Sequence, residues 1–161
     1  MIRIAIGEDH QSLIDGIALL IRDEAHIQLV CSATNGLELV QAVRKYQPDV
    51  IITDIRMPKM DGIQATEIIK KEFPEIAVIA FTMFDQQDAV QQMLDAGASG
   101  YILKNSSLQT LKKAIETVAE GTPFFDSQIE LNNFEDDHTA TSKNGLLTKR
   151  QLEILRLIAH G

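Results

Sequence analysis

Short apolar runs alternate along the chain with longer stretches in which apolar residues recur at helical spacing. Residues 11 to about 24 show helical spacing, because Leu13, Ile17 and Leu20 would share one face of a helix. Residues 49–53 form a continuous run rich in β-branched residues, which is typical of a strand buried on both faces. In this way the sequence predicts strands at residues 2–6, 27–33, 49–53, 76–81 and 100–103. It predicts helices at residues 11 to about 24, around 37–43, 61 to about 72, 85–96 and 106–120.

Local signals define several of the predicted helix ends. The second helix must end before Pro48, because the residue before a proline avoids the helical conformation. Gly97 is placed to close the fourth helix. Ser106 and Gln109 have the spacing of a capping box, which predicts that Ser106 caps the fifth helix.

Five strands that alternate with five helices predict an α/β domain over residues 1–121. Parallel strands need crossover connections, and the helices in those connections cover both faces of the sheet. In folds of this kind, functional residues gather at the carboxyl ends of the strands. That edge of the predicted sheet is therefore where chemistry is expected.

The periodic pattern stops after Gly121. Residues 122–146 are mostly polar and acidic, and we interpret them as a linker. A new helix is predicted within residues 147–161, where Thr148 and Gln151 have capping-box spacing and apolar residues form a stripe. One short helix cannot bury such a stripe alone, so we expect it to pack on the first domain or on a partner, or the chain to have been cut.

Composition narrows the function classes. The chain has 161 residues and a net charge of −8, so long-range attraction to a phosphate backbone is not expected. The single cysteine, Cys31, excludes an internal disulfide and suggests an inert buried thiol. The start lacks the pattern of a secretory signal, and no apolar run approaches the about 18 residues that span a bilayer. We expect a cytoplasmic protein without a membrane partner.

Polar side chains come after the predicted strands at the edge where function is expected. Glu8 and Asp9 come after the first strand, Asp54 after the third, Thr82 at the end of the fourth and Lys104 after the fifth. Because the strands are parallel, all five residues should lie along one edge of the sheet. Each residue by itself has an ordinary structural interpretation as a cap, a turn or a surface charge. Their joint placement is what favours a functional site.

Three carboxylates held close together repel one another, and a divalent cation is the usual resolution. Oxygen ligands without histidine or cysteine suit Mg²⁺. A carboxylate that stays partly free can attack phosphorus and form an aspartyl phosphate. The metal and Lys104 would then neutralise the charge that develops on the phosphoryl oxygens.

The same residues resemble the receiver domains of two-component response regulators. The resemblance covers about residues 1–121 and rests on a set of short motifs. These are Glu8-Asp9, the Asp-x-x-Met-Pro-x-Met-Asp-Gly run from Asp54 to Gly62, Thr82, Gly97-Ala98-Ser99-Gly100-Tyr101, and Lys104.

The resemblance implies a CheY-like, flavodoxin-like fold with strand order 2-1-3-4-5. It implies that Asp54 is the phosphoacceptor, that Thr82 and Lys104 contact the phosphoryl group, and that Tyr101 is a switch that turns inward when Thr82 moves. It assigns Mg²⁺ (or Mn²⁺) to Glu8, Asp9, Asp54 and the backbone carbonyl of Arg56. The phosphoryl donor would be a sensor histidine kinase that docks mostly on the first helix, and phosphorylation would control a homodimer or the release of an output domain. The chain would not be an enzyme beyond its own phosphorylation and slow autodephosphorylation.

Residues 147–161 are similar to the first helix of a LuxR-type helix-turn-helix domain. This similarity implies a transcription regulator of the NarL/FixJ type. The helix that would enter the major groove is absent from the sequence, so DNA binding is expected only of a full-length parent protein. We interpret the end at Gly161 as an engineered or proteolytic truncation.

Three alternatives remain open. An aspartyl-phosphate phosphohydrolase would carry a second aspartate two positions after the nucleophile, where this chain has Arg56. A flavin-binding module would need a phosphate-binding loop after the first strand, where Glu8 and Asp9 would repel the phosphate. A scaffold that uses the fold without phosphorylation predicts that Asp54→Asn has no effect.

Overall fold

Six parallel strands form one sheet, in the order β2-β1-β3-β4-β5-β6. The computed structural model describes residues 1–83 and 87–126. The strands are β1 (Ile2–Gly7), β2 (Ile27–Ala33), β3 (Val50–Thr53), β4 (Ala77–Thr82), β5 (Gly100–Leu103) and β6 (Phe124–Phe125). The helices are α1 (Gln11–Arg22), α2 (Gly36–Tyr46), α3 (Gly62–Glu72), α4 (Gln87–Ala96) and α5 (Leu108–Ala119).

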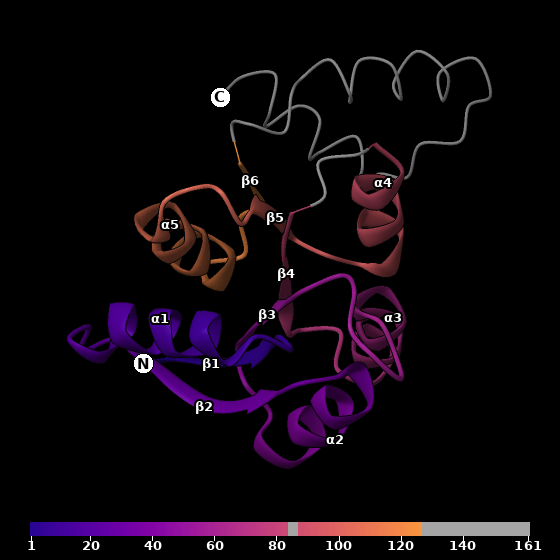
Figure 1. Cartoon of the computed structure of the whole chain (residues 1–161), viewed down its shortest axis with the longest axis horizontal. Helices are drawn as coiled ribbons and strands as arrows, with labels where there is room; N and C mark the ends of the chain where they lie inside the picture. Colours follow the sequence, from indigo (N-terminus) through magenta and orange to yellow (C-terminus); the bar gives the residue numbers. More distant parts are fainter. Residues whose placement is uncertain (84–86, 127–161) are drawn as a thin grey trace.

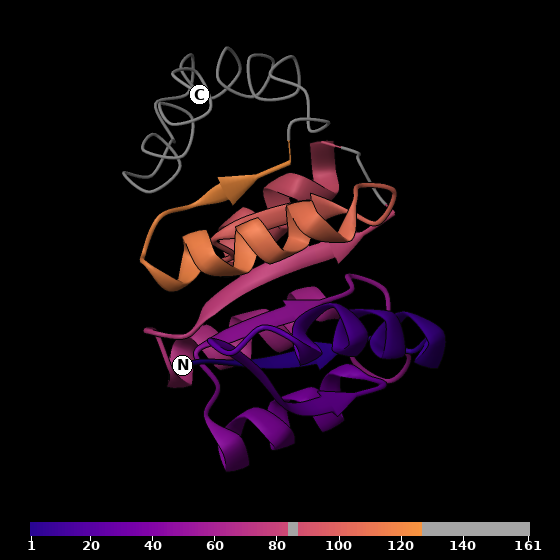
Figure 2. The same ribbon diagram turned by 90° about the vertical axis from the view of Figure 1, so that its left-hand side faces the viewer.

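The helices cover both faces of the sheet. Figure 1 shows α1 and α5 on one side and α2, α3 and α4 on the other, and Figure 2 shows α1 and α5 in front of the strands. Successive residues of a strand point to opposite faces, so β3 sends Ile51 into the core beneath α2, α3 and α4, and Ile52 into the core beneath α1 and α5. All four residues of β3 are buried, as its unbroken apolar sequence predicts.

The five predicted strands and their order are confirmed, with strand ends that differ from the prediction by at most one residue. The sixth strand was missed, because Phe124-Phe125 is too short to show an alternating pattern and was assigned to the linker. The predicted linker beyond Asp126 and the predicted helix within residues 147–161 lie outside the described residues.

The predicted cap of α5 was wrong. Ser107, not Ser106, precedes the helix, and its Oγ accepts a hydrogen bond from the Thr110 N–H at 3.2 Å. The Ser106 hydroxyl instead donates to the carboxylate of Asp126. Two adjacent serines can cap a helix equally well, and the hydrogen bond of Ser106 to Asp126 leaves Ser107 as the cap.

Gly97 and Cys31 were also singled out in the sequence. Gly97 closes α4 with a φ of +111°, as expected of a glycine at a helix end. Cys31 is only partly buried in β2, and this burial raises the pKa of its thiol above the usual value. Within the described residues, the helices are too short or too polar to cross a bilayer.

Gly62, the first residue of α3, allows the loop after β3 to fold back over the strand end. Its N–H donates to the Ile55 carbonyl at 2.7 Å. A Cβ atom at this position would lie 2.0 Å from the Asp54 carbonyl oxygen, which is far inside van der Waals contact. Asp61 then begins the helix with a capping box shared with Gln64. The close packing of Gly62 against the Asp54 carbonyl therefore helps to hold the backbone of Asp54 in place.

Replacing Gly62 with alanine should therefore lower the free energy of unfolding by about 1–3 kcal/mol, because the new methyl group would overpack the loop. The matched control is Gly16→Ala, in the middle of α1, where an added Cβ meets nothing within 4 Å. That substitution should raise the free energy of unfolding by about 0.5–1 kcal/mol. Urea unfolding of both variants checks the pair, and a Gly62→Ala protein as stable as the wild type would contradict the packing argument.

Candidate functional site

The carboxyl edge of the sheet brings together polar residues that are far apart in the sequence. In the register of the sheet, Gly7 on β1 is opposite Thr53 on β3, so Glu8 and Asp54 both leave the sheet at this edge. The Asp54 N–H donates to the Gly7 carbonyl at 2.8 Å. The Lys104 N–H donates to the Thr82 carbonyl at 2.8 Å, which aligns the ends of β4 and β5 in the same way.

The Lys104 ammonium joins two buried carboxylates. Its Nζ lies 2.6 Å from Glu8 Oε1 and 2.9 Å from Asp54 Oδ2. The exposed fractions of the side chains are 12% for Lys104, 3% for Glu8 and 8% for Asp54. The sequence predicted that these three residues would meet, and the structure places them in direct contact.

The charges around Lys104 shift its pKa. Burial, the largest single influence, lowers the pKa of the ammonium, but the hydrogen bonds and negative charges of Glu8 and Asp54 together outweigh it. The pKa of Lys104 therefore lies above its usual value, and the lysine stays charged at neutral pH.

Asp9 and His10 lie at the outer rim of this cluster. His10 Nδ1 is 2.9 Å from Glu8 Oε2 and 3.2 Å from Asp9 Oδ1. Glu8 and Asp9 raise the pKa of the His10 imidazole: the hydrogen bond to Glu8 has the largest effect, and the negative charge of Asp9 has the next largest. In the sequence, the position of His10 directly after Glu8 and Asp9 was the one signal that pointed to this contact. The His10 ring is largely exposed and remains at the border of the site.

Thr82 and Tyr101 are buried on β4 and β5, the two strands that lead to Lys104. Thr82 ends β4 and is fully buried, and Tyr101 on β5 has an exposed fraction of 1%. Tyr101 packs in the core beneath α2, α3 and α4 and is opposite Ala80 in the register of the sheet. Arg56, whose carbonyl the sequence analysis assigned to the metal, comes two residues after Asp54 in the loop, and its side chain is exposed.

The donor set fits a hard divalent cation. The carboxylates of Glu8, Asp9 and Asp54 outnumber the one permanent positive charge, that of Lys104, and His10 also contacts Glu8 and Asp9. Within the described residues, ligand atoms of Glu8, Asp9 and His10 lie within 4.8 Å of one another, and Asp54 shares the Lys104 ammonium with Glu8. The carboxylates would bind a metal through oxygen atoms, and Mg²⁺ prefers oxygen ligands. A divalent cation would balance the remaining charge and allow two buried carboxylates to lie side by side.

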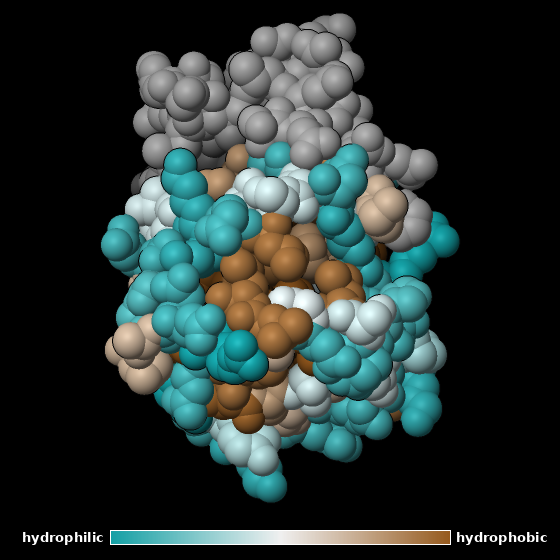
Figure 3. All heavy atoms as spheres, turned by 60° about the vertical axis from the view of Figure 1, so that its left-hand side comes forward, coloured by the Kyte–Doolittle hydropathy of each residue, from teal (hydrophilic) through white to brown (hydrophobic). Residues whose placement is uncertain are grey.

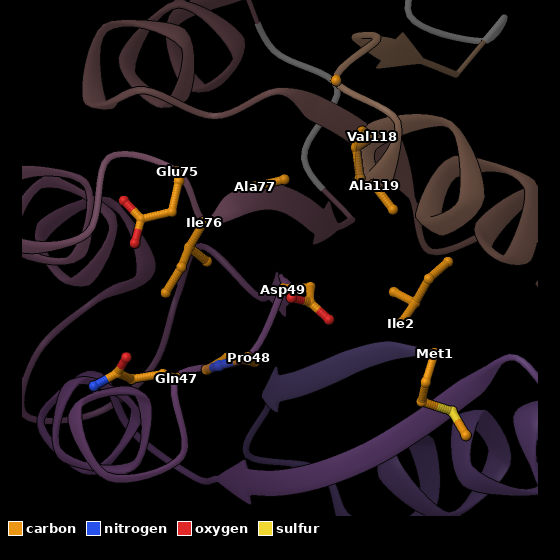
Figure 4. A pocket seen from close by; sticks show the side chains of 11 residues that line it. Met1, Ile2, Gln47, Pro48, Asp49, Glu75, Ile76, Ala77, Val118 and Ala119 are labelled. Atoms are coloured by element: carbon orange, nitrogen blue, oxygen red, sulfur yellow. The ribbon is translucent and has the colours of Figure 1, made fainter.

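A separate hollow of about 430 Å³ opens at the opposite edge of the sheet. Figure 4 shows Ile2, Asp49 and Ala77 around it, from the beginning of β1, the residue before β3 and the beginning of β4. The Asp49 carboxylate accepts a hydrogen bond from the Arg3 N–H at 2.8 Å, so it holds two strands in register. The acidic cluster and Lys104 lie at the other end of the strands, so this hollow is separate from the candidate functional site.

A parallel sheet with acidic side chains, a threonine and a lysine at its carboxyl edge defines the class of CheY-like α/β receiver domains. Residues 4–116 match the family model for the response regulator receiver domain, and the chain belongs to this family. It is the receiver domain of a two-component response regulator, as the sequence motifs predicted.

Relatives of known sequence and structure agree with this assignment. The oxygen regulatory protein NreC of Staphylococcus epidermidis (strain ATCC 12228) is 36% identical, over 99% of this chain and 78% of its own length. A LuxR-family response regulator from Aurantimonas sp. SI85-9A1 has a TM-score of 0.80 and 28% identity, over 85% of this chain and 98% of that one. The receiver domain of RcsB from Salmonella enterica serovar Typhimurium, solved with the phosphomimetic BeF3−, has a TM-score of 0.74 and 26% identity, over 80% and 95% of the two chains.

Replacing Lys104 with methionine should lower the free energy of unfolding by about 1–3 kcal/mol in metal-free buffer, because two buried carboxylates lose their charged partner. Added Mg²⁺ should recover part of this loss. In the wild type, the stabilisation by Lys104 is present below the usual lysine pKa and is lost as the pH rises through the raised value.

Urea unfolding with and without Mg²⁺ measures both effects. Lys71→Met, at an exposed position of α3, is the control and should change the stability little. If Lys104→Met unfolds at the same urea concentration as the wild type without metal, the ammonium does not offset the two carboxylates.

Proposed function

We propose that Asp54 accepts a phosphoryl group from a sensor histidine kinase and that the added charge changes the surface of the domain. The observation that carries this proposal is that the buried carboxylates of Asp54 and Glu8 both contact one partly buried ammonium, that of Lys104. Asp54 keeps one oxygen, Oδ1, outside the Lys104 contact, and that oxygen is the nucleophile we assign.

In the transfer, an Asp54 oxygen attacks phosphorus while the bond between phosphorus and the kinase imidazole nitrogen breaks. The imidazole leaves with the electron pair of that bond and takes up a proton from solvent. Lys104, already charged and within 2.9 Å of Asp54, is placed to pair with the phosphoryl oxygens as negative charge gathers on them. The buried Thr82 hydroxyl is the group we assign to a further phosphoryl oxygen.

Glu8, Asp9, Asp54 and the Arg56 backbone carbonyl are the groups we assign to Mg²⁺, with Mn²⁺ as a substitute. When bound, the metal would neutralise the charge of the phosphoryl group as it arrives among carboxylates. The receiver family generally binds Mg²⁺ at its acidic pocket.

We propose that the switch acts through Thr82 and Tyr101. Pairing of Thr82 with the phosphoryl group would draw its hydroxyl toward Asp54 and favour the buried position of the Tyr101 ring. This bias acts on an equilibrium between two packings of the same core. The packing of β5 against its helices is then what a partner would sense.

The kinase should dock on α1 beside the acidic cluster, mostly near Gln11 to Leu13. Figure 3 turns the side of the molecule that carries α1 and α5 toward the viewer, and hydrophobic side chains gather in its middle with hydrophilic ones around them. Leu13 and Leu20 on α1 and Leu108 on α5 are partly buried at this side of the core, and Leu19 is exposed. Apolar side chains with a polar rim are typical of a protein interface.

We infer that the output is control of transcription in the cytoplasm, through dimerisation or the release of a DNA-binding domain. The LuxR-type similarity of residues 147–161 and of the relatives supports this output. Residues 1–126 carry the switch, and DNA contact belongs to the full-length parent protein. We also propose that the chain accepts one phosphoryl group and is not a multiple-turnover phosphatase, because Arg56 stands where a general acid would be needed.

Incubation with acetyl phosphate and Mg²⁺ should add one phosphoryl group per chain, detected by intact mass. Asp54→Asn should abolish the addition, because the amide oxygen is not a nucleophile for phosphorus. Removal of Mg²⁺ with a chelator should also stop the reaction in the wild type.

The matched control is Asp23→Asn, whose side chain is 86% exposed after α1 and which should be phosphorylated like the wild type. Label that persists in a folded Asp54→Asn protein would refute the assignment of Asp54. Sustained hydrolysis of acetyl phosphate over many turnovers would favour a phosphatase instead.

A further inference from the structure

The sixth strand ties the end of the described chain to the strand that carries the switch. β6 pairs with β5 in parallel, with Gly100 opposite Phe124 and Tyr101 opposite Phe125. The Phe124 N–H donates to the Ser99 carbonyl at 3.0 Å, and the Asp126 N–H donates to the Tyr101 carbonyl at 2.9 Å. The segment that leaves the receiver domain is thus hydrogen-bonded to the backbone of Tyr101.

The two phenylalanines of β6 anchor it on opposite faces of the sheet. Phe124 packs against the core beneath α1 and α5, and Phe125 packs against the core beneath α2, α3 and α4. Both side chains remain partly exposed at the edge of the sheet. A two-residue strand has little pairing energy of its own, so its position depends on these side-chain contacts and on those of the adjoining Asp126.

Asp126, the residue after β6, places a buried carboxylate against the loop that carries Lys104. Its exposed fraction is 3%. Asp126 Oδ2 accepts a hydrogen bond from the Leu103 N–H at 3.2 Å, and it also accepts one from the Ser106 hydroxyl. Leu103 immediately precedes Lys104, and Ser106 comes two residues after it, so one carboxylate holds both sides of the lysine.

The lysine itself is fixed at its two ends. Its backbone N–H donates to the Thr82 carbonyl, and its ammonium contacts Glu8 and Asp54. The lysine side chain between these contacts is long and flexible. The position of its ammonium therefore depends on where the loop from Leu103 to Ser106 is held. A shift of the loop by about 1 Å is enough to cost much of the rate of a positioned reaction.

We propose that Asp126 is a positioning residue for Lys104, and that it couples the phosphoryl pocket to the pairing of β6 with the sheet. This inference rests on the proposed function of Lys104. Coupling between two sites is reciprocal. If the Asp126 carboxylate holds Lys104 in place for the phosphoryl group, then binding of that group should in turn strengthen the pairing of β6 with the sheet. The segment beyond β6 would then receive the signal through its own first residues.

The test compares Asp126→Ala with Asp126→Asn in the full chain. Alanine removes the acceptor for Leu103 and Ser106, whereas the asparagine amide oxygen can replace it. Asp126→Ala should slow phosphorylation by acetyl phosphate with Mg²⁺ about tenfold to a hundredfold, and Asp126→Asn should restore most of the rate. Asp23→Ala is the control for a distant, exposed carboxylate and should keep the wild-type rate.

A double-mutant cycle separates positioning from a general loss of structure. If Asp126 acts through Lys104, then Asp126→Ala should slow the reaction little in a Lys104→Met background. An equal fold-change in both backgrounds, or no change in the single variant, would overturn the inference. Failure of the wild type to accept phosphate at all would instead refute the proposed function, so the two failures are distinct.

A second measurement on the wild type covers the case in which Asp126→Ala does not fold. Beryllofluoride with Mg²⁺ fills the pocket as a phosphoryl mimic, and amide hydrogen exchange then reports on β6. Exchange at Phe124 and Asp126 should slow when the mimic binds, because both amides donate into the sheet. Unchanged exchange at both amides, with binding verified by protection elsewhere in the site, would show that β6 is not coupled to the pocket.

Discussion

A single ammonium between two buried carboxylates organises the carboxyl edge of this sheet. Lys104 contacts Glu8 and Asp54, which lie far from it and from each other in the sequence, and its charge allows both acids to remain buried close together. With Asp9, three carboxylates lie around one permanent positive charge, and the receiver family generally binds Mg²⁺ at such an acidic pocket. In the function proposed above, the charge of a phosphoryl group and its metal would change the balance among these residues.

The backbone around this contact is held by the sheet and by one tight loop. Main-chain hydrogen bonds from Asp54 to Gly7 and from Lys104 to Thr82 align the end of β3 with β1 and the end of β5 with β4. Gly62 lets the loop after β3 pass over the Asp54 carbonyl, where a larger residue would not fit. The side chains of the candidate site therefore lie just beyond strands that are buried on both faces of the sheet.

The receiver domain extends further along the chain than its five principal strands. β6 and Asp126 continue the sheet past α5 and return the chain to the loop of Lys104. The path from the phosphoryl pocket to the end of the described residues is consequently short, since it needs only β5, its neighbouring loop and one carboxylate. An output segment attached at this point would begin next to the residues to which we assign the sensing of the phosphoryl group.

The sequence by itself determined the five principal strands, the helices between them and the family, because apolar periodicity and strand-end motifs are local properties of the chain. It also brought Glu8, Asp54 and Lys104 to one edge, since parallel strands leave no other place for residues that come directly after them. Only the tertiary structure decided that Ser107 rather than Ser106 caps α5 and that Phe124-Phe125 is a strand. The choice between the serines depends on Asp126, which lies 20 residues from Ser106 in the sequence, and the last strand depends on the packing of a very short segment. The physical reason is that local sequence sets what a residue can do, whereas the distant group it meets decides which of those possibilities it adopts.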